Sequence, residues 1–176
     1  MNSLPTPEFS RTIKVDQIGR LSGDTRIVAD AGEREALMRR FGLLALDRLE
    51  ADYQLGEENG AIVARGRVRA TLAQPCVATG VAVDERIDTD FMLRFVVESA
   101  DAVDSDELEL DAEDCDIIGY DGQMIDMGEA VAETMALAMT PFPRAPDADA
   151  QLRAAGVLSE DQASPFAVLL GLKDKP

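Results

Sequence analysis

Alternating apolar and polar residues mark the centre of the chain as β-structure. From 49 to 55, leucine, alanine and tyrosine alternate with charged or polar residues, and the same period of two runs from 62 to 72. The segment 56–60, made of glycine and polar residues, separates the two runs as a turn. The pattern therefore predicts a β-hairpin with one apolar face and one charged face.

One antiparallel register satisfies both faces of this hairpin. Pairing Leu55 with Ile62 keeps the apolar side chains together on one side of the sheet. The same register produces two ion pairs on the charged side, Asp52 with Arg65 and Glu50 with Arg67. A slip by one residue would set an arginine against Leu49, so we expect the register that begins with Leu55 and Ile62.

Capping signals predict two main helices. Asp30 followed by Glu33 has the spacing of a capping box, and Gly42 is suited to end that helix. Asp126 followed by Glu129 repeats the spacing, and two prolines just beyond residue 140 stop the second helix.

Alternation also predicts strands over 10–18 and 86–97. The run 101–116 contains nine acidic residues and no basic one, and Leu108 and Leu110 alternate within it. We expect part of this run to form an edge strand.

These elements predict an α+β fold. Its antiparallel β-sheet, built as a hairpin and meander and either open or barrel-like, would pack with two main α-helices and a short C-terminal helix. We expect a single domain over 1–143. A linker rich in proline, aspartate and alanine would follow over 144–163, and a docking tail over 164–176.

Charge is distributed unevenly along the 176 residues. The net charge is −17, and residues 95–176 carry −15 of it, with 19 acidic and 4 basic groups. Such a half should repel a nucleic-acid backbone and attract basic proteins. No apolar run is long enough to span a membrane, and the first residues lack the pattern of a signal peptide, so we expect a cytoplasmic protein.

Histidine is absent, which removes the commonest general base and most transition-metal ligand sets. Cys76 and Cys115 lie too far apart in sequence for a paired-ligand zinc motif and are too few for a disulfide framework. We therefore predict no catalytic residue, no cofactor and no metal. With no base nearby, Cys76 is expected to be an inert, partly buried thiol.

Basic residues on the charged sheet face are candidates for nucleic-acid binding. Three arginines at alternate positions would stand about 7 Å apart, near the spacing of successive phosphates. The candidate RNA-binding residues are Arg65, Arg67, Arg69, Arg86 and Arg94. The alternative is a charge-paired face in which carboxylates neutralise the arginines. Those carboxylates are Glu50, Asp52, Asp88 and Asp90.

The acidic run is a candidate surface for a basic protein. Its candidate protein-binding residues are Asp104, Asp106, Glu107, Glu109 and Asp111. Counted from Asp114, it fails the calcium-loop template because the fifth position is Ile118. Magnesium chemistry, as in a metal-dependent hydrolase, is the weaker alternative. Glu129 and Glu133 also lie on one helix face, but Glu129 is expected to serve the capping box.

Three segments resemble the YceD family. The strand that ends in Leu72–Cys76 is similar to an apolar family strand running into a cysteine. Tyr120–Met127, followed by an acidic helix and Pro141, resembles the family's glycine, Ile-Asp-Leu, acidic helix and proline segment. Ser164–Lys173 is similar to its C-terminal Asn-Pro-Phe-Ala ending. Together these segments cover most of residues 60–176.

The resemblance implies a role in accumulation of large-subunit ribosomal RNA. Family members often carry Cys-x-x-Cys where this chain has Thr79 in place of the second cysteine, so we predict no zinc here. The favoured hypothesis is a non-enzymatic ribosome-biogenesis factor that binds large-subunit rRNA or its precursor, a basic ribosomal protein, or both. The alternatives are the hydrolase above and a homodimeric protein-interaction module that pairs sheet edges.

Overall fold

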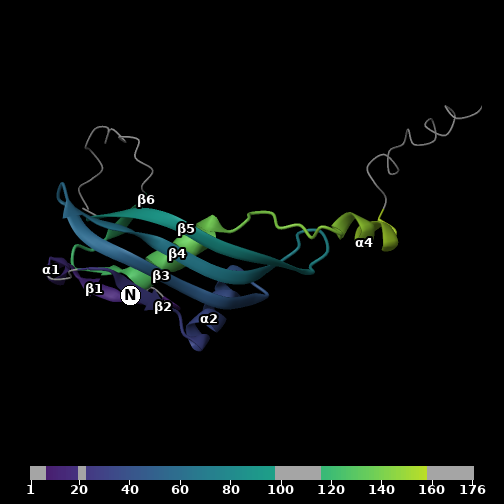
Figure 1. Ribbon diagram of the computed structural model, residues 1–176, viewed down its shortest axis with the longest axis horizontal. Helices are drawn as coiled ribbons and strands as arrows, with labels where there is room; N and C mark the ends of the chain where they lie inside the picture. The colour runs from purple at the N-terminus through teal and green to yellow at the C-terminus, as the bar shows by residue number, and fades with distance from the viewer. Residues whose placement is uncertain (1–6, 20–22, 98–115, 158–176) are drawn as a thin grey trace, which may run out of the picture.

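The computed structural model describes residues 7–19, 23–97 and 116–157, and Figure 1 shows their arrangement. A five-stranded sheet has the order β2-β3-β4-β5-β6. Its strands are β2 (Thr25–Val28), β3 (Ala45–Glu58), β4 (Ala61–Pro75), β5 (Ala82–Val97) and β6 (Asp116–Tyr120). All neighbours are antiparallel except β5 and β6, which are parallel.

Two smaller groups of elements complete the described part of the chain. A two-stranded sheet joins β1 (Thr12–Lys14) to β7 (Met124–Asp126). The helices are α1 (Val15–Ile18), α2 (Ala31–Phe41), α3 (Met127–Ala138) and α4 (Ala148–Ala154). The α+β prediction is confirmed, and the sheet is open rather than closed into a barrel.

The loop of the β3–β4 hairpin is shorter than the five-residue turn predicted over 56–60. Asn59 and Gly60 alone form the loop, with φ of 51° and 76°. Positive φ at both loop residues is the geometry of a type I′ turn, which Asn-Gly strongly favours. Because Glu58 then pairs with Ala61, the whole ladder shifts by two residues from the predicted one.

The predicted register was therefore wrong, although the predicted faces were right. Leu55 pairs with Ala64 rather than with Ile62. On the charged side the opposing pairs are Asp52 with Arg67 and Glu50 with Arg69. A shift of two residues returns every side chain to the same face, so the apolar pattern did not distinguish the two registers.

The core lies between one face of this sheet and the helices α2 and α3, which cross behind the strands in Figure 1. Leu49, Val68 and Phe95 project from the strands, and Leu37 and Met135 come from the two helices; all five are buried. Burying a side chain of this kind contributes about 1.5–3 kcal/mol. Together with the other buried apolar side chains of this cluster, these residues stabilise the packing of the helices on the sheet.

Local caps place the two helices as predicted. Asp30 Oδ1 accepts from the Glu33 N–H at 2.9 Å, Glu33 Oε2 accepts from the Asp30 N–H at 2.8 Å, and Gly42 ends α2 with a φ of 66°. Asp126 caps α3 by accepting from the N–H groups of Gly128 and Glu129. The predicted second capping box does not form, because the Glu129 side chain contacts α2 instead.

Several elements differ from the sequence prediction. The strand expected over 10–18 is confined to β1, and its second half is the single turn α1. The short strands β2 and β6 were missed. Within the predicted linker, α4 forms, and Ala145 and Ala148 pack against Cys76. The possible edge strand around Leu108 and the short C-terminal helix lie outside the described residues.

Candidate interface on the open face of the sheet

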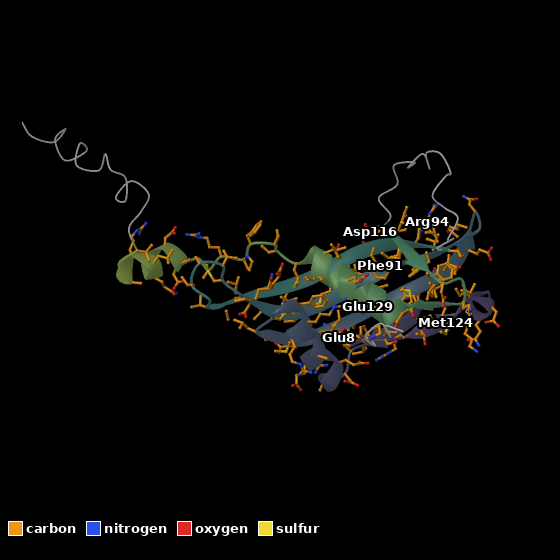
Figure 2. All side chains as sticks on the ribbon, turned by 180° about the vertical axis from the view of Figure 1, so that it is seen from behind. Glu8, Phe91, Arg94, Asp116, Met124 and Glu129 are labelled. Atoms are coloured by element: carbon orange, nitrogen blue, oxygen red, sulfur yellow. The ribbon has the colours of Figure 1, made fainter. Side chains whose placement is uncertain are left out.

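The face of the sheet away from α2 and α3 carries the arginine row. Because side chains alternate along β4, Arg65, Arg67 and Arg69 project together on the side opposite Val68 and Ala70. Figure 2 shows α2 and α3 on the near side of the sheet, so this charged face lies behind it in that view. The sequence correctly placed the three arginines on one face.

Carboxylates from the two neighbouring strands, β3 and β5, surround the row. Arg67 contacts both Asp88 and Asp90 of β5, at 2.5 and 2.9 Å. The two aspartates raise the pKa of the Arg67 guanidinium, and its hydrogen bond in turn lowers the pKa of Asp88. Arg65 forms an ion pair with Glu58, whose pKa it lowers. Each contact replaces exposed positive charge by a neutral pair.

The deepest part of this network is centred on Glu50, which is only 5% exposed. Arg26 of β2 donates a hydrogen bond to Glu50 at 3.0 Å, and Arg48, which lies on β3 like Glu50, donates another. Arg69 of β4 approaches Glu50 to 3.7 Å. These guanidinium groups, Arg48 first, hold the pKa of Glu50 below its ordinary value. Arg69 also contacts Asp52 at 2.5 Å. A buried carboxylate with three cationic neighbours ties β2, β3 and β4 together.

Arg86 and Arg94 differ from the row, since neither forms a salt bridge within the described ranges. They lie at opposite ends of β5, and Arg94 stands beside β6, where Figure 2 labels it. The Nε of Arg94 is buried and finds no hydrogen-bond partner among the described residues. The five arginines named from the sequence thus divide into three that are paired and two that form no salt bridge with a described residue.

The acidic candidates cannot be placed in the same way. Asp104, Asp106, Glu107, Glu109 and Asp111 all lie outside the described residues, as does Cys115. Among the residues that are described, no group of three or more carboxylates or thiols is arranged to hold a metal ion. No described helix is long and apolar enough to cross a membrane.

Glu129 has a different role from the one the sequence suggested. Both of its carboxylate oxygens accept from Arg40 of α2, at 2.7 and 2.8 Å. Arg40 also contacts Glu8 at 3.0 Å, so one guanidinium joins the N-terminal segment, α2 and α3. Partial burial, with the nearby Glu129 charge, raises the pKa of Glu133. A contact between residues 89 positions apart leaves no signal in the local sequence.

Cys76 lies in a more polar setting than the sequence suggested. It is buried in the turn between β4 and β5, and the Ala145 N–H donates to its Sγ at 3.3 Å. That hydrogen bond, helped by backbone N–H groups of Ala78 and Thr79, lowers the pKa of the thiol to about 7. Sequence reasoning missed this because the main donor comes from the segment preceding α4, 69 positions away.

Comparison with known proteins connects this geometry to one family. A family model described as "Large ribosomal RNA subunit accumulation protein YceD" matches residues 64–173, more than half of the chain. The matched segment contains the arginine row, β5, α3, Cys76 and the Ala145 that donates to its thiol. No curated protein and no solved structure matches the chain.

Proposed function

This chain belongs to the YceD family of large ribosomal RNA subunit accumulation proteins, and on that premise we propose that it acts by binding a basic ribosomal protein rather than by catalysis. Family membership supports a role in ribosome biogenesis. The observation that carries the finer proposal is the charge distribution: −15 of the net −17 lies in residues 95–176. Such a surface attracts basic chains and repels phosphate backbones.

The open sheet face supports the same choice of partner. A phosphate backbone approaching Arg67 would have to displace Asp88 and Asp90, which already contact its guanidinium. The same holds for Arg69, which contacts Asp52. Neutralised arginines contribute little to phosphate binding, because that binding depends on releasing counterions from exposed positive charge.

Direct contact with ribosomal RNA is the second candidate function. Arg86 and Arg94 favour it, since neither is neutralised by a carboxylate in the described part of the chain. The metal-dependent hydrolase would use the acids of 101–126 and has no comparable support: the chain lacks histidine, and most of that stretch lies outside the described residues. We therefore keep the RNA contact as the alternative to be tested.

The deciding experiment is recovery of ribosomal components with the tagged protein from cells at low and at moderate salt. One variant carries Arg65→Gln, Arg67→Gln and Arg69→Gln. The other carries Asp104→Asn, Asp106→Asn, Glu107→Gln, Glu109→Gln and Asp111→Asn. Circular dichroism of both variants is the control that tests whether each still folds.

We expect large-subunit proteins to be recovered with the wild type and with the arginine variant, but to be lost with the acidic variant. Loss with the arginine variant alone would transfer the contact to the sheet face and to RNA. Recovery of no ribosomal component with the wild type at either salt would contradict the proposal.

A further inference from the structure

Much of the β5 edge has no partner strand among the described residues. β6 pairs only with residues 93–97, so the stretch 82–92 pairs with β4 on one side and with no described strand on the other. Figure 1 shows this edge running along the upper border of the sheet beyond the end of β6. The stretch exceeds a typical strand of about 5–6 residues. Its outward N–H and C=O groups form a template for an added strand.

A groove runs beside this edge on the helix side. A cavity of about 650 Å³ opens between β5 and the last turns of α3. Phe91, Thr134, Leu137 and Ala138 line it, and Gly66 lets the Phe91 ring pack against β4, since a Cβ there would lie 2.7 Å from Cζ of that ring. Leu137 is 76% exposed, which is unusual for a leucine beside the core. An extended chain placed along β5 would direct a side chain into this groove where it passes residues 90–92.

The other side of the same edge is acidic. Asp84, Asp88 and Asp90 project from β5 on the open face, with Arg86 as the single base among them. Arg67 contacts Asp88 and Asp90, and Arg69 also approaches Asp88 at 3.6 Å, whereas Asp84 forms no salt bridge among the described residues. The Asp90 side chain keeps 78% of its exposure. The remaining side chains of an added strand would therefore meet negative charge.

We propose that the β5 edge over 82–92 binds an extended segment of a basic protein as an additional strand, with basic and apolar side chains in alternation. Apolar side chains would occupy the groove beside Leu137, and basic ones would lie over Asp88 and Asp90. Backbone hydrogen bonds would supply affinity and the alternating contacts specificity, as in other cases of strand addition. This inference rests on the proposed function and assigns that function's partner a place on the sheet.

Charge favours a basic segment at this edge over a second copy of the chain or an RNA strand. A second copy of the chain would bring another −17 to the contact, which opposes association at low salt. An RNA strand would meet Asp88 and Asp90 first, and it has no N–H and C=O ladder to pair with the strand edge. A basic peptide satisfies the backbone, the groove and the carboxylates together.

The test uses the whole protein and a ten-residue peptide of alternating lysine and valine, with an alternating glutamate and valine peptide as control. Binding is measured by fluorescence anisotropy, and amide hydrogen exchange locates the contact. We expect the lysine peptide alone to bind, and to slow the exchange of amides within 82–92. Amides of 82–92 that point away from β4 and are already protected in the free protein by other segments of the same chain would overturn the proposal. So would protection elsewhere, or equal binding of both peptides.

Variants of exposed residues test the two sides of the edge without disturbing the core. Leu137→Ser and Asp90→Asn should each weaken peptide binding by about tenfold, near the 1.4 kcal/mol of one good contact. Val28→Ser is the matched control, because Val28 is 47% exposed on β2 at the opposite edge of the sheet. Unchanged affinity in both variants, or loss with Val28→Ser alone, would contradict the assignment.

The same variants separate this inference from the proposed function. Suppose that the double variant Leu137→Ser, Asp90→Asn no longer binds the peptide but ribosomal proteins are still recovered with it from cells. The ribosomal partner then does not bind at the β5 edge, and the proposed function stands. If the wild type binds the peptide at 82–92 but recovers no ribosomal component, the site stands and the ribosomal role falls. Salt-dependent dimers protected over 82–92 would assign the edge to a second copy and overturn the proposal.

Discussion

The two faces of the five-stranded sheet are built from the same strands but are held by different forces. Leu49 and Glu50 are neighbours on β3, and both are buried, one under the helices and the other under arginines. Leu49 gains its stability from the removal of apolar surface, which needs no precise partner. Glu50 is tolerated only because Arg26, Arg48 and Arg69 surround it.

From this difference we infer that the helix side of the sheet stabilises the fold and that the open side determines which partner binds. The cost of losing apolar burial depends little on pH or on moderate changes in salt concentration, whereas the energy of ion pairs responds strongly to both. Most ion pairs of the open face are also exposed, and exposed pairs contribute only about 0–1 kcal/mol each. We therefore expect substitutions on the helix side to change folding, and substitutions on the open side mainly to change what the protein binds.

The largest effect should follow from breaking the apolar face at Leu49. Leu49→Ala should lower the free energy of unfolding by about 2–5 kcal/mol, because it leaves a cavity under α2 and α3. Urea denaturation followed by circular dichroism measures this change. Leu44→Ala, at a leucine that is 49% exposed, is the control and should cost far less. Equal losses in the two variants would show that the helix side is not the stabilising face.

A smaller loss is expected where the N-terminal segment crosses α3 at Gly128. A Cβ at this position would lie 2.5 Å from the carbonyl oxygen of Phe9, which is fully buried. Gly128→Ala should therefore lower the melting temperature, at a cost of about 1–3 kcal/mol. Gly19→Ala serves as the control because a Cβ there meets no atom within 4 Å. A melting temperature of Gly128→Ala equal to that of the wild type would mean that the segment around Phe9 moves aside at little cost in free energy.

On the open face, the strongest effect should come from the buried carboxylate. Glu50→Gln should cost about 1–2 kcal/mol at neutral pH, because three guanidinium groups lose their ionic partner. The folded-state pKa of Glu50 is lowered from 4.5, so its stabilisation is complete above that value. It is then lost as the pH falls through the folded-state pKa.

Urea titrations of the wild type and Glu50→Gln between pH 7 and pH 3 measure this linkage. The difference between the two proteins should shrink as the pH falls below about 4.5. Glu57→Gln, at an exposed position next to the turn, is the control and should show a much weaker dependence. A Glu50→Gln difference that is constant with pH would show that Glu50 contributes packing rather than charge.

The smallest effect is expected at Asp90, whose side chain is 78% exposed although it contacts Arg67. Asp90→Asn should change the free energy of unfolding by less than about 1 kcal/mol, and by less still at high salt. Urea denaturation at two salt concentrations measures it. A loss as large as that of Leu49→Ala would remove the distinction between the two faces.

Local signals in the sequence predicted the parts of the fold that depend on near neighbours. The helix cap Asp30, its partner Glu33 and the terminator Gly42 all lie within one helix and were placed correctly. The side of the sheet on which each arginine projects follows from alternation and was also correct. The Asn59-Gly60 turn carried a local signal too, and reading it would have corrected the register.

Other features depend on residues that are distant in sequence. β2 and β6 are strands only because β3 and β5 offer them an edge, and short segments of this length have weak preferences of their own. Glu129 was assigned to a cap because the cap was the nearest partner; Arg40 became available only when α2 packed beside α3. The donor to Cys76 also arrives from a remote segment.

The sequence by itself determined which residues are apolar, which face of a strand each one occupies, and where α2 and α3 begin. Those properties rest on contacts within about four residues, whose energies do not depend on the rest of the chain. Only the tertiary structure decided which carboxylates contact Arg67 and Arg69, and which part of the β5 edge has no partner among the described strands. Registers that differ by two residues bury the same apolar face, so turn geometry and long-range packing choose between them.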